Sequence, residues 1–120
     1  MSELHRPPGK TTVSPGVVMA IARMAALAVP GVKSISRSPR RSGGLFRRRS
    51  DEGVRMTMED GVLSGDIYLV LEGDVNLRDV GREVQNQVAR AIQEMVGTPV
   101  ARIDVHVEDI AYGESEPDLR

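Results

Sequence analysis

The residues of this chain that could do chemistry start with its two histidines. His5 lies in an N-terminal stretch with two prolines, and His106 lies among alternating charged and apolar residues. Nucleophilic catalysis needs a hydroxyl or thiol beside such a base, yet neither histidine is accompanied by a recognisable serine or threonine motif. The chain also has no cysteine, which excludes thiolate nucleophiles, disulfides and cysteine-ligated metal sites. We therefore do not expect triad chemistry.

The row Asp104, His106 and Glu108 is the one grouping that could bind a metal ion, since carboxylate and imidazole are both competent ligands. The three residues alternate along a predicted strand and so share one face. Neighbours on that face are about 7 Å apart, so one ion would rarely contact all three. A solvated polar face with Arg102 as an ion-pair partner is the alternative, and the spacing favours it.

The remaining acids and glycines form no catalytic pattern. Glu59 and Asp60 stand at a predicted turn, where they are exposed, whereas general acid–base catalysis needs a carboxylate held in a cleft. Gly43 and Gly44 lack the strand and helix that flank phosphate-binding loops. From the residues alone we expect a protein that is not an enzyme, with no catalytic residue, cofactor, metal or small-molecule substrate.

A cluster of arginines is the feature with the clearest capacity to bind. From Lys33 to Arg49 the chain holds seven of its 16 lysines and arginines and none of its 17 acids. Arginine binds phosphate through paired hydrogen bonds and by releasing counterions, so nucleic acid and anionic lipid are both candidate ligands. Phe46 is the only aromatic residue in the cluster, which disfavours base-specific RNA recognition. A solvated loop without a ligand is the third reading. The candidate partner- or anion-binding residues are Arg37, Arg40, Arg41, Arg47, Arg48 and Arg49.

An unusually apolar helix is predicted to precede this cluster. Ser14 can cap it, Pro15 suits its first turn, and Gly31 marks its end. Arg23 is the only charged residue between Pro15 and Val29. A helix that is apolar on nearly every side must be covered by more than one sheet face. Burial within the monomer and self-association both satisfy this requirement, and the first is the simpler.

Asp60-Gly61 predicts a β-hairpin with a type I′ turn, because both residues accept positive φ. A two-residue turn there pairs Glu59 with Val62 and, farther from the turn, Val54 with Ile67. The pairing also sorts the side chains into two faces. The inward face is expected to hold Val54, Met56, Met58, Leu63, Ile67, Leu69 and Leu71, and the outward face Asp66, Tyr68, Val70 and Glu72.

A second helix and a last strand complete the predicted fold. Asn76 can cap the helix, whose apolar residues recur at spacings of three and four, and Gly97 ends it. Gly81 inside this helix costs about 1 kcal/mol relative to alanine, and we expect the close approach of another backbone to be its reason. The last strand alternates charged residues with Ile103, Val105 and Val107.

With a short strand at Val32–Ser36, the predicted order is helix, strand, loop, strand, strand, helix, strand. Elements of this size pack as an α+β two-layer sandwich, a four-stranded sheet with two helices packed on one face. We expect a flexible N-terminal arm (residues 1–10), a single domain (11–112) and an acidic disordered tail (113–120). The N-terminus has no signal-peptide pattern, and the most apolar stretch, Val17–Val32, is shorter than the bilayer-spanning length of about 20 residues. A cytoplasmic protein is therefore expected.

A series of short motifs extends over residues 9–112. It begins with Ser14-x-x-Val17 before an alanine-rich helix, the Gly31-Val32 that ends this helix, and the basic loop before Gly53-Val54. It continues through the second helix and the last strand, at Val84, Gln85, Val88, Ala91, Ile92, Met95, Gly97, Val100, Ile103, Val105, Val107, Ile110 and Tyr112. In these motifs the chain resembles the bacterial alkaline shock protein family. The arginine density of the loop and Pro99 depart from the family pattern.

The resemblance implies a non-enzymatic protein of the cell-envelope stress response, with no catalytic residues to carry over. It also implies a cytoplasmic protein that self-associates, or that a membrane-anchored partner holds at the inner face of the cell membrane. We accordingly predict an interaction or scaffold protein that forms homo-oligomers. The alternative prediction is a nucleic-acid-binding module that uses the arginine-rich loop 37–49.

Overall fold

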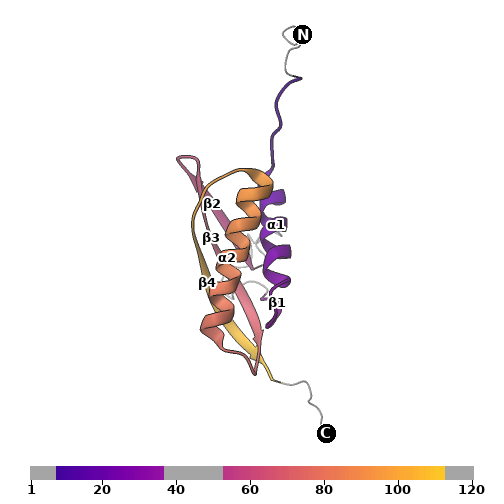
Figure 1. Ribbon diagram of the computed structural model, residues 1–120, viewed down its shortest axis with the longest axis vertical. Helices are drawn as coiled ribbons and strands as arrows, with labels where there is room; N and C mark the ends of the chain where they lie inside the picture. The colour runs from indigo at the N-terminus through magenta and orange to yellow at the C-terminus, as the bar shows by residue number, and fades with distance from the viewer. Residues whose placement is uncertain (1–7, 37–52, 113–120) are drawn as a thin grey trace, which may run out of the picture.

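The computed structural model describes residues 8–36 and 53–112. Six elements follow one another in these ranges: α1 (Pro15–Leu27), β1 (Val32–Ile35), β2 (Val54–Glu59), β3 (Val62–Glu72), α2 (Leu77–Val96) and β4 (Val100–Ala111). The order predicted from the sequence is confirmed. The α+β class is confirmed as well, because the two helices lie side by side over one face of a four-stranded sheet (Figure 1).

β3 is the centre of the sheet, because every other described strand pairs with it. β1 and β2 are antiparallel to β3 and follow one another along the same edge, with Ile35 opposite Leu69 and Val54 opposite Ile67. β4 pairs with the other edge and runs parallel to β3. The sheet is therefore mixed, and α2 forms the crossover connection that a parallel pair of strands requires.

The predicted pairing of the hairpin is confirmed, but Met58, which we expected on the inward face, is 54% exposed near the turn. Asp60 and Gly61 have φ values of 53° and 79°, as a type I′ turn requires, and Glu59 lies opposite Val62. The rest of β3 follows the alternation that this register sets. Its buried residues are Leu63, Gly65, Ile67, Leu69 and Leu71, and the residues between them are partly exposed.

Short-range signals set the ends of the helices. Asn76 accepts a hydrogen bond from the Asp79 N–H at 2.9 Å, which is the predicted cap of α2. Gly97 ends α2 in the left-handed conformation (φ 83°), and its N–H donates to carbonyls of the last helical turn. Ser14 is the N-cap residue of α1, but its side chain makes no capping hydrogen bond within the described part of the chain. Instead, the Val17 N–H donates to the Ser14 carbonyl at 2.9 Å, and Pro15 has no N–H to satisfy.

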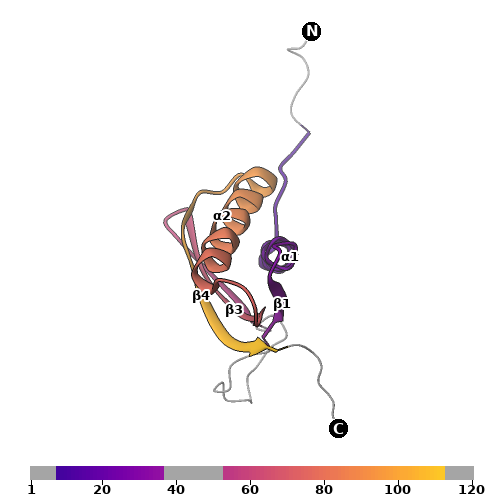
Figure 2. The same cartoon turned by 60° about the horizontal axis from the view of Figure 1, so that its bottom comes forward.

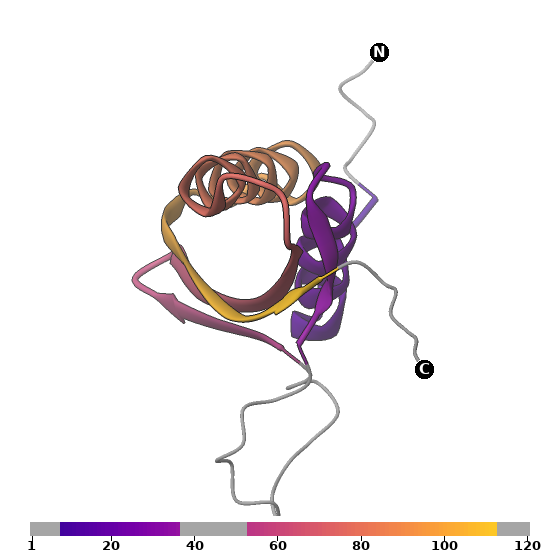
Figure 3. The ribbon, with the colours of Figure 1, turned by 90° about the horizontal axis from the view of Figure 1, so that it is seen from below.

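The two helices divide the sheet between them. α1 packs on β1 and β2, α2 packs on β4, and the helices also pack on each other. Figure 2 shows this arrangement obliquely, and Figure 3 shows it from the end of the molecule. The inward side chains of both helices meet those of β3 in one apolar core. The largest side chains that are fully buried there are Ile67, Leu69, Leu71, Ile92, Val54, Val84 and Val88.

Gly81 in α2 has surroundings that differ from our prediction. A methyl group built there would lie 3.8 Å from a Val105 side-chain carbon, which is an ordinary contact, and no described backbone outside the helix comes within 4 Å. The prediction that another backbone approaches Gly81 is therefore wrong for the fold of one chain. The cost of about 1 kcal/mol relative to alanine has no packing reason within these residues.

The predicted arm and tail fall mostly outside the structure, since residues 1–7 and 113–120 are not among those described. Their flexibility stays a prediction. Neither helix in the described ranges is long and apolar enough to span a membrane.

Candidate interaction surfaces

The six candidate arginines, Arg37, Arg40, Arg41, Arg47, Arg48 and Arg49, lie outside the described residues. The structure does show how their segment is attached to the sheet. Ser36 donates its N–H to the Tyr68 carbonyl at 2.8 Å, and the Tyr68 N–H donates to the Gly53 carbonyl at 2.9 Å. Ser36 and Gly53, the described residues on either side of the segment 37–52, are therefore both hydrogen-bonded to a single residue of β3. The role of the segment in anion binding stays a prediction.

The face of the sheet that points away from the helices carries a polar cluster. His106 Nε2 lies 2.9 Å from Asp66 Oδ1, and the His106 ring stacks on Tyr68 with their centroids 4.5 Å apart and 16° between the planes. The parallel register causes this, because it places Tyr68 of β3 directly beside His106 of β4. The side chains of His106 and Asp66 remain 39% and 38% exposed, so their contact contributes at most about 1 kcal/mol. We interpret the cluster as a surface contact that joins the two strands.

The predicted row of metal ligands is broken in β4. Asp104 and His106 share the outward face, but a β-bulge beyond them puts Asp109, and not Glu108, in register with β3. The prediction that Glu108 continues the row is therefore wrong. Asp104 instead lies 3.1 Å from Arg102, as the reading of a solvated polar face predicts. Among the described residues, no three histidine or acidic side chains are placed to hold a metal ion.

α1 is buried on one side only. Its core-facing side chains are Val18, Ile21, Ala22 and Ala26. The opposite side of the helix faces solvent, although it too is apolar. Burial within the monomer, the simpler of our two readings, therefore accounts for only half of this helix.

The exposed side of α1 forms a continuous apolar strip. Val13, just before the helix, is 41% exposed, Val17 is 47%, Met24 is 61% and Leu27 is 44%. Ala20 between them is exposed as well. We call these five residues the α1 face. An exposed apolar surface of this kind commonly marks a binding site for another protein.

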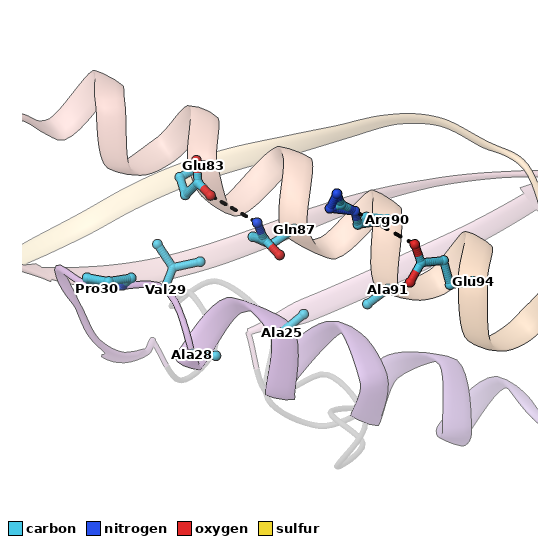
Figure 4. Close-up of a pocket in the computed structure, with 9 residues that line it drawn as sticks. All are labelled: Ala25, Ala28, Val29, Pro30, Glu83, Gln87, Arg90, Ala91 and Glu94. Carbon is cyan, nitrogen blue, oxygen red and sulfur yellow. Dashed lines mark hydrogen bonds and ion pairs between the residues drawn. The ribbon is translucent and has the colours of Figure 1, made fainter.

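A groove runs between α1 and α2 beside the α1 face (Figure 4). It has a volume of about 320 Å³, and its floor is formed by Ala25 and other small apolar residues. Its rim on α2 is polar, because Gln87 donates to Glu83 at 3.0 Å and Arg90 lies 3.8 Å from Glu94. Arg90 and Glu94 are 58% and 72% exposed, so water screens this pair and both groups can contact another molecule.

A second groove, of about 350 Å³, lies between α2 and β4. Gln85 reaches across it and donates to the Ile103 carbonyl at 3.0 Å, which satisfies this group without another strand. Arg78 and Arg82 also line the groove. Charged side chains beside an edge strand discourage pairing with another sheet. We therefore regard β4 as a protected edge.

Several known proteins are similar to this chain. The uncharacterized protein Spy1535 of Streptococcus pyogenes serotype M6 is 31% identical over 115 residues, which are 93% of this chain and 88% of that protein. The uncharacterized protein YqhY of Bacillus subtilis strain 168 is 26% identical over 108 residues, which are 87% and 78% of the two chains. Among solved structures, the copper form of MamM CTD aligns with a TM-score of 0.58 and 15% identity, over 85% of this chain and 92% of that one. A likeness at this identity shows the fold alone.

The family assignment comes from the sequence along nearly its whole length. A family model matches residues 3–112, a range that includes all six described elements and the arginine-rich segment. The chain therefore belongs to the alkaline shock protein 23 family, whose function is related to the cell envelope.

Proposed function

We propose that this protein is a non-enzymatic interaction protein of the cell envelope and that the α1 face is its contact surface. In the cytoplasm it would hold a copy of itself, or a membrane-anchored protein at the inner face of the cell membrane. The observation that carries the proposal is the exposure of the α1 face along the whole helix, from Val13 to Leu27. Leaving such a strip in water is unfavourable, at about 25 cal/mol for each Å² of apolar surface, and a partner would remove that cost.

The polar groups of the described residues support binding better than catalysis. Active sites desolvate the groups that they use, and this shifts their protonation. Every buried side chain in the described ranges is apolar, and the charged pair at the groove, Arg90 and Glu94, is mostly exposed. Such groups suit reversible contacts at a protein surface.

Capture of the protein at the envelope tests this proposal. The tagged chain and its Met24→Glu variant would be expressed in the native host, cross-linked, and compared in membrane and soluble fractions. Met95→Glu is the matched control, because Met95 is 65% exposed, Met24 is 61% exposed, and both lie on helices. We expect Met24→Glu to lower the membrane-bound or self-cross-linked fraction about tenfold or more, which corresponds to about 1.4 kcal/mol. Retention equal to that of Met95→Glu would contradict the proposed surface.

Nucleic-acid binding through the loop 37–49 is the second candidate function, because cations without acids gather there. Affinity for bare RNA that falls steeply with salt would support it. Changing Arg47, Arg48 and Arg49 to serine is expected to abolish binding of RNA, or of vesicles with anionic lipid, without unfolding the protein. If the wild-type chain does not bind RNA at low salt, this candidate is wrong.

A further inference from the structure

We infer that a second copy of this chain covers the α1 face, related to the first by a two-fold axis along α1, with Arg23 of each copy beside Glu94 of the partner subunit. The inference rests on the proposed function, which makes the α1 face a contact surface for protein. In this arrangement the two α1 helices lie parallel, and each removes the other's apolar strip from water.

The spacing along the α1 face suits a second copy of the same helix. From Val13 to Leu27 its residues alternate steps of four and three, the repeat by which two parallel helices interlock along a seam. Ala20 stands in the middle of the strip, where a small side chain lets the two helices approach closely. Closed two-fold pairs are also the commonest symmetric assemblies. The apolar strip is therefore complementary to itself.

The charges beside the α1 face select the direction of the axis. Arg23 is the only charged residue of α1 and borders the strip on one side, and the groove to α2 borders it on the other. With a two-fold axis parallel to the helices, the Arg23 side of each α1 face lies against the groove side of the partner's α1 face. Arg23 then faces the rim of the partner's groove. An axis across the helices instead brings the two Arg23 side chains together. Because the rim carries Glu83 and Glu94 against the single cation Arg90, charge favours the axis along the helices.

The heights of the two charged groups along the helices agree with this axis. α1 and α2 are antiparallel, with Gly31 beside Val80 at one end (Figure 1). In the groove, Val29 and Pro30 lie beside Glu83, and Ala25 lies farther along α2, toward Ala91 (Figure 4). Arg23 comes two residues beyond Ala25 in the same direction, toward the Glu94 end of the rim. Side chains in a helix point toward the N-terminus of that helix. Because α1 and α2 are antiparallel, this direction brings the ends of the Arg23 and Glu94 side chains closer together along the helix axes. A rotation about an axis along the helix preserves height, and Glu94 of the partner subunit is then the nearest acid of the rim.

The size of the surface sets the expected strength of the pair. A helix of 13 residues is about 20 Å long and about 10 Å wide. The area that one such helix can bury is small compared with the roughly 800 Å² that each partner buries in a standard interface. Contact of each α1 with the rim on α2 enlarges the footprint, but it stays at the small end of specific interfaces. We therefore expect a dimer with a Kd on the order of 1–100 µM.

Sedimentation velocity of the full chain, from about 1 µM to about 500 µM, tests the inference with a charge exchange. Arg23→Glu alone and Glu94→Arg alone each bring like charges together, so each is expected to weaken self-association about tenfold or more. A 1:1 mixture of the two variants is expected to dimerise with about the wild-type affinity. In the mixed dimer both contacts join opposite charges. One contact keeps the native arginine at position 23 and glutamate at position 94, and the other has glutamate at position 23 and arginine at position 94.

Two controls keep the result interpretable. Glu94 is at the surface, with its side chain 72% exposed, and Arg23 is partly exposed, so circular dichroism should show the native fold in both variants. Met24→Glu changes the strip itself and should abolish dimerisation without reference to the charges.

Two results would overturn the inference: a wild-type chain that stays monomeric over the whole concentration range, or a mixture that associates no better than the single variants. The proposed function would fail separately. If Met24→Glu still lost capture at the envelope, the α1 face would remain a contact surface, with a different protein as its occupant.

Discussion

Replacing Gly81 by alanine is expected to stabilise the protein by about 1 kcal/mol. Glycine inside a helix costs about that amount relative to alanine, because it loses more backbone freedom on folding. Gly81 follows the first turn of α2, which runs from Leu77 to Val96. The added methyl group would meet only a Val105 carbon at 3.8 Å, so no steric clash offsets the gain. In a domain of this size, such a change raises the midpoint of thermal unfolding by roughly 4–8 °C.

Urea unfolding followed by circular dichroism measures this change, and an unchanged m-value would show that the shifted midpoint reports stability. Gly97→Ala is the matched control, because Gly97 ends α2 at a φ of 83°, where a side chain is strained by roughly 1–2 kcal/mol. We expect the two substitutions to have opposite signs. If Gly97→Ala destabilises as expected while Gly81→Ala is neutral or destabilising, the surroundings of Gly81 in solution are not those of the single chain, and the reasoning is refuted.

Three further changes test the fold at different depths in the same urea assay. Asn76→Ala removes the side-chain acceptor of the α2 cap and should destabilise by about 1 kcal/mol; a loss near zero would mean that water replaces the cap. Ile67→Ala should cost about 2–5 kcal/mol, because Ile67 is fully buried on the central strand, and a loss below about 1 kcal/mol would argue against the central place of β3. In a double-mutant cycle to alanine, the coupling of Asp66 with His106 should not exceed about 1 kcal/mol, since both side chains are more than a third exposed; a larger coupling would contradict their role as a surface contact.

The β2–β3 hairpin could be predicted to the residue because two independent signals coincide there. Asp60-Gly61 demands a two-residue turn, and the register that this turn imposes places most of the aliphatic residues of both strands on one face. The ends of α2 were predictable for a similar reason, since the cap at Asn76 and the stop at Gly97 are set by neighbours within a few residues.

Features that depend on distant parts of the chain could not be predicted in this way. The neighbours of Gly81 are set by the packing of α2 on β4, which no local pattern describes. The bulge that displaces Glu108 arises from the fit of β4 to β3. α1 is apolar on nearly all sides, so its sequence could not show which half would be left in water. The predicted arginine site was assigned from composition alone, and its residues fall outside the described ranges.

The hydrogen bonds of Ser36 and Gly53 with Tyr68 make the pairing of the sheet independent of the sequence between these two residues. β1 and β2 continue one another along the same edge of β3, so a change in the length or charge of the sequence between them need not disturb any strand pairing. A short glycine–serine bridge from Ser36 to Gly53 should accordingly leave the domain folded. The strand pairing of the sheet therefore does not require the arginines between Ser36 and Gly53.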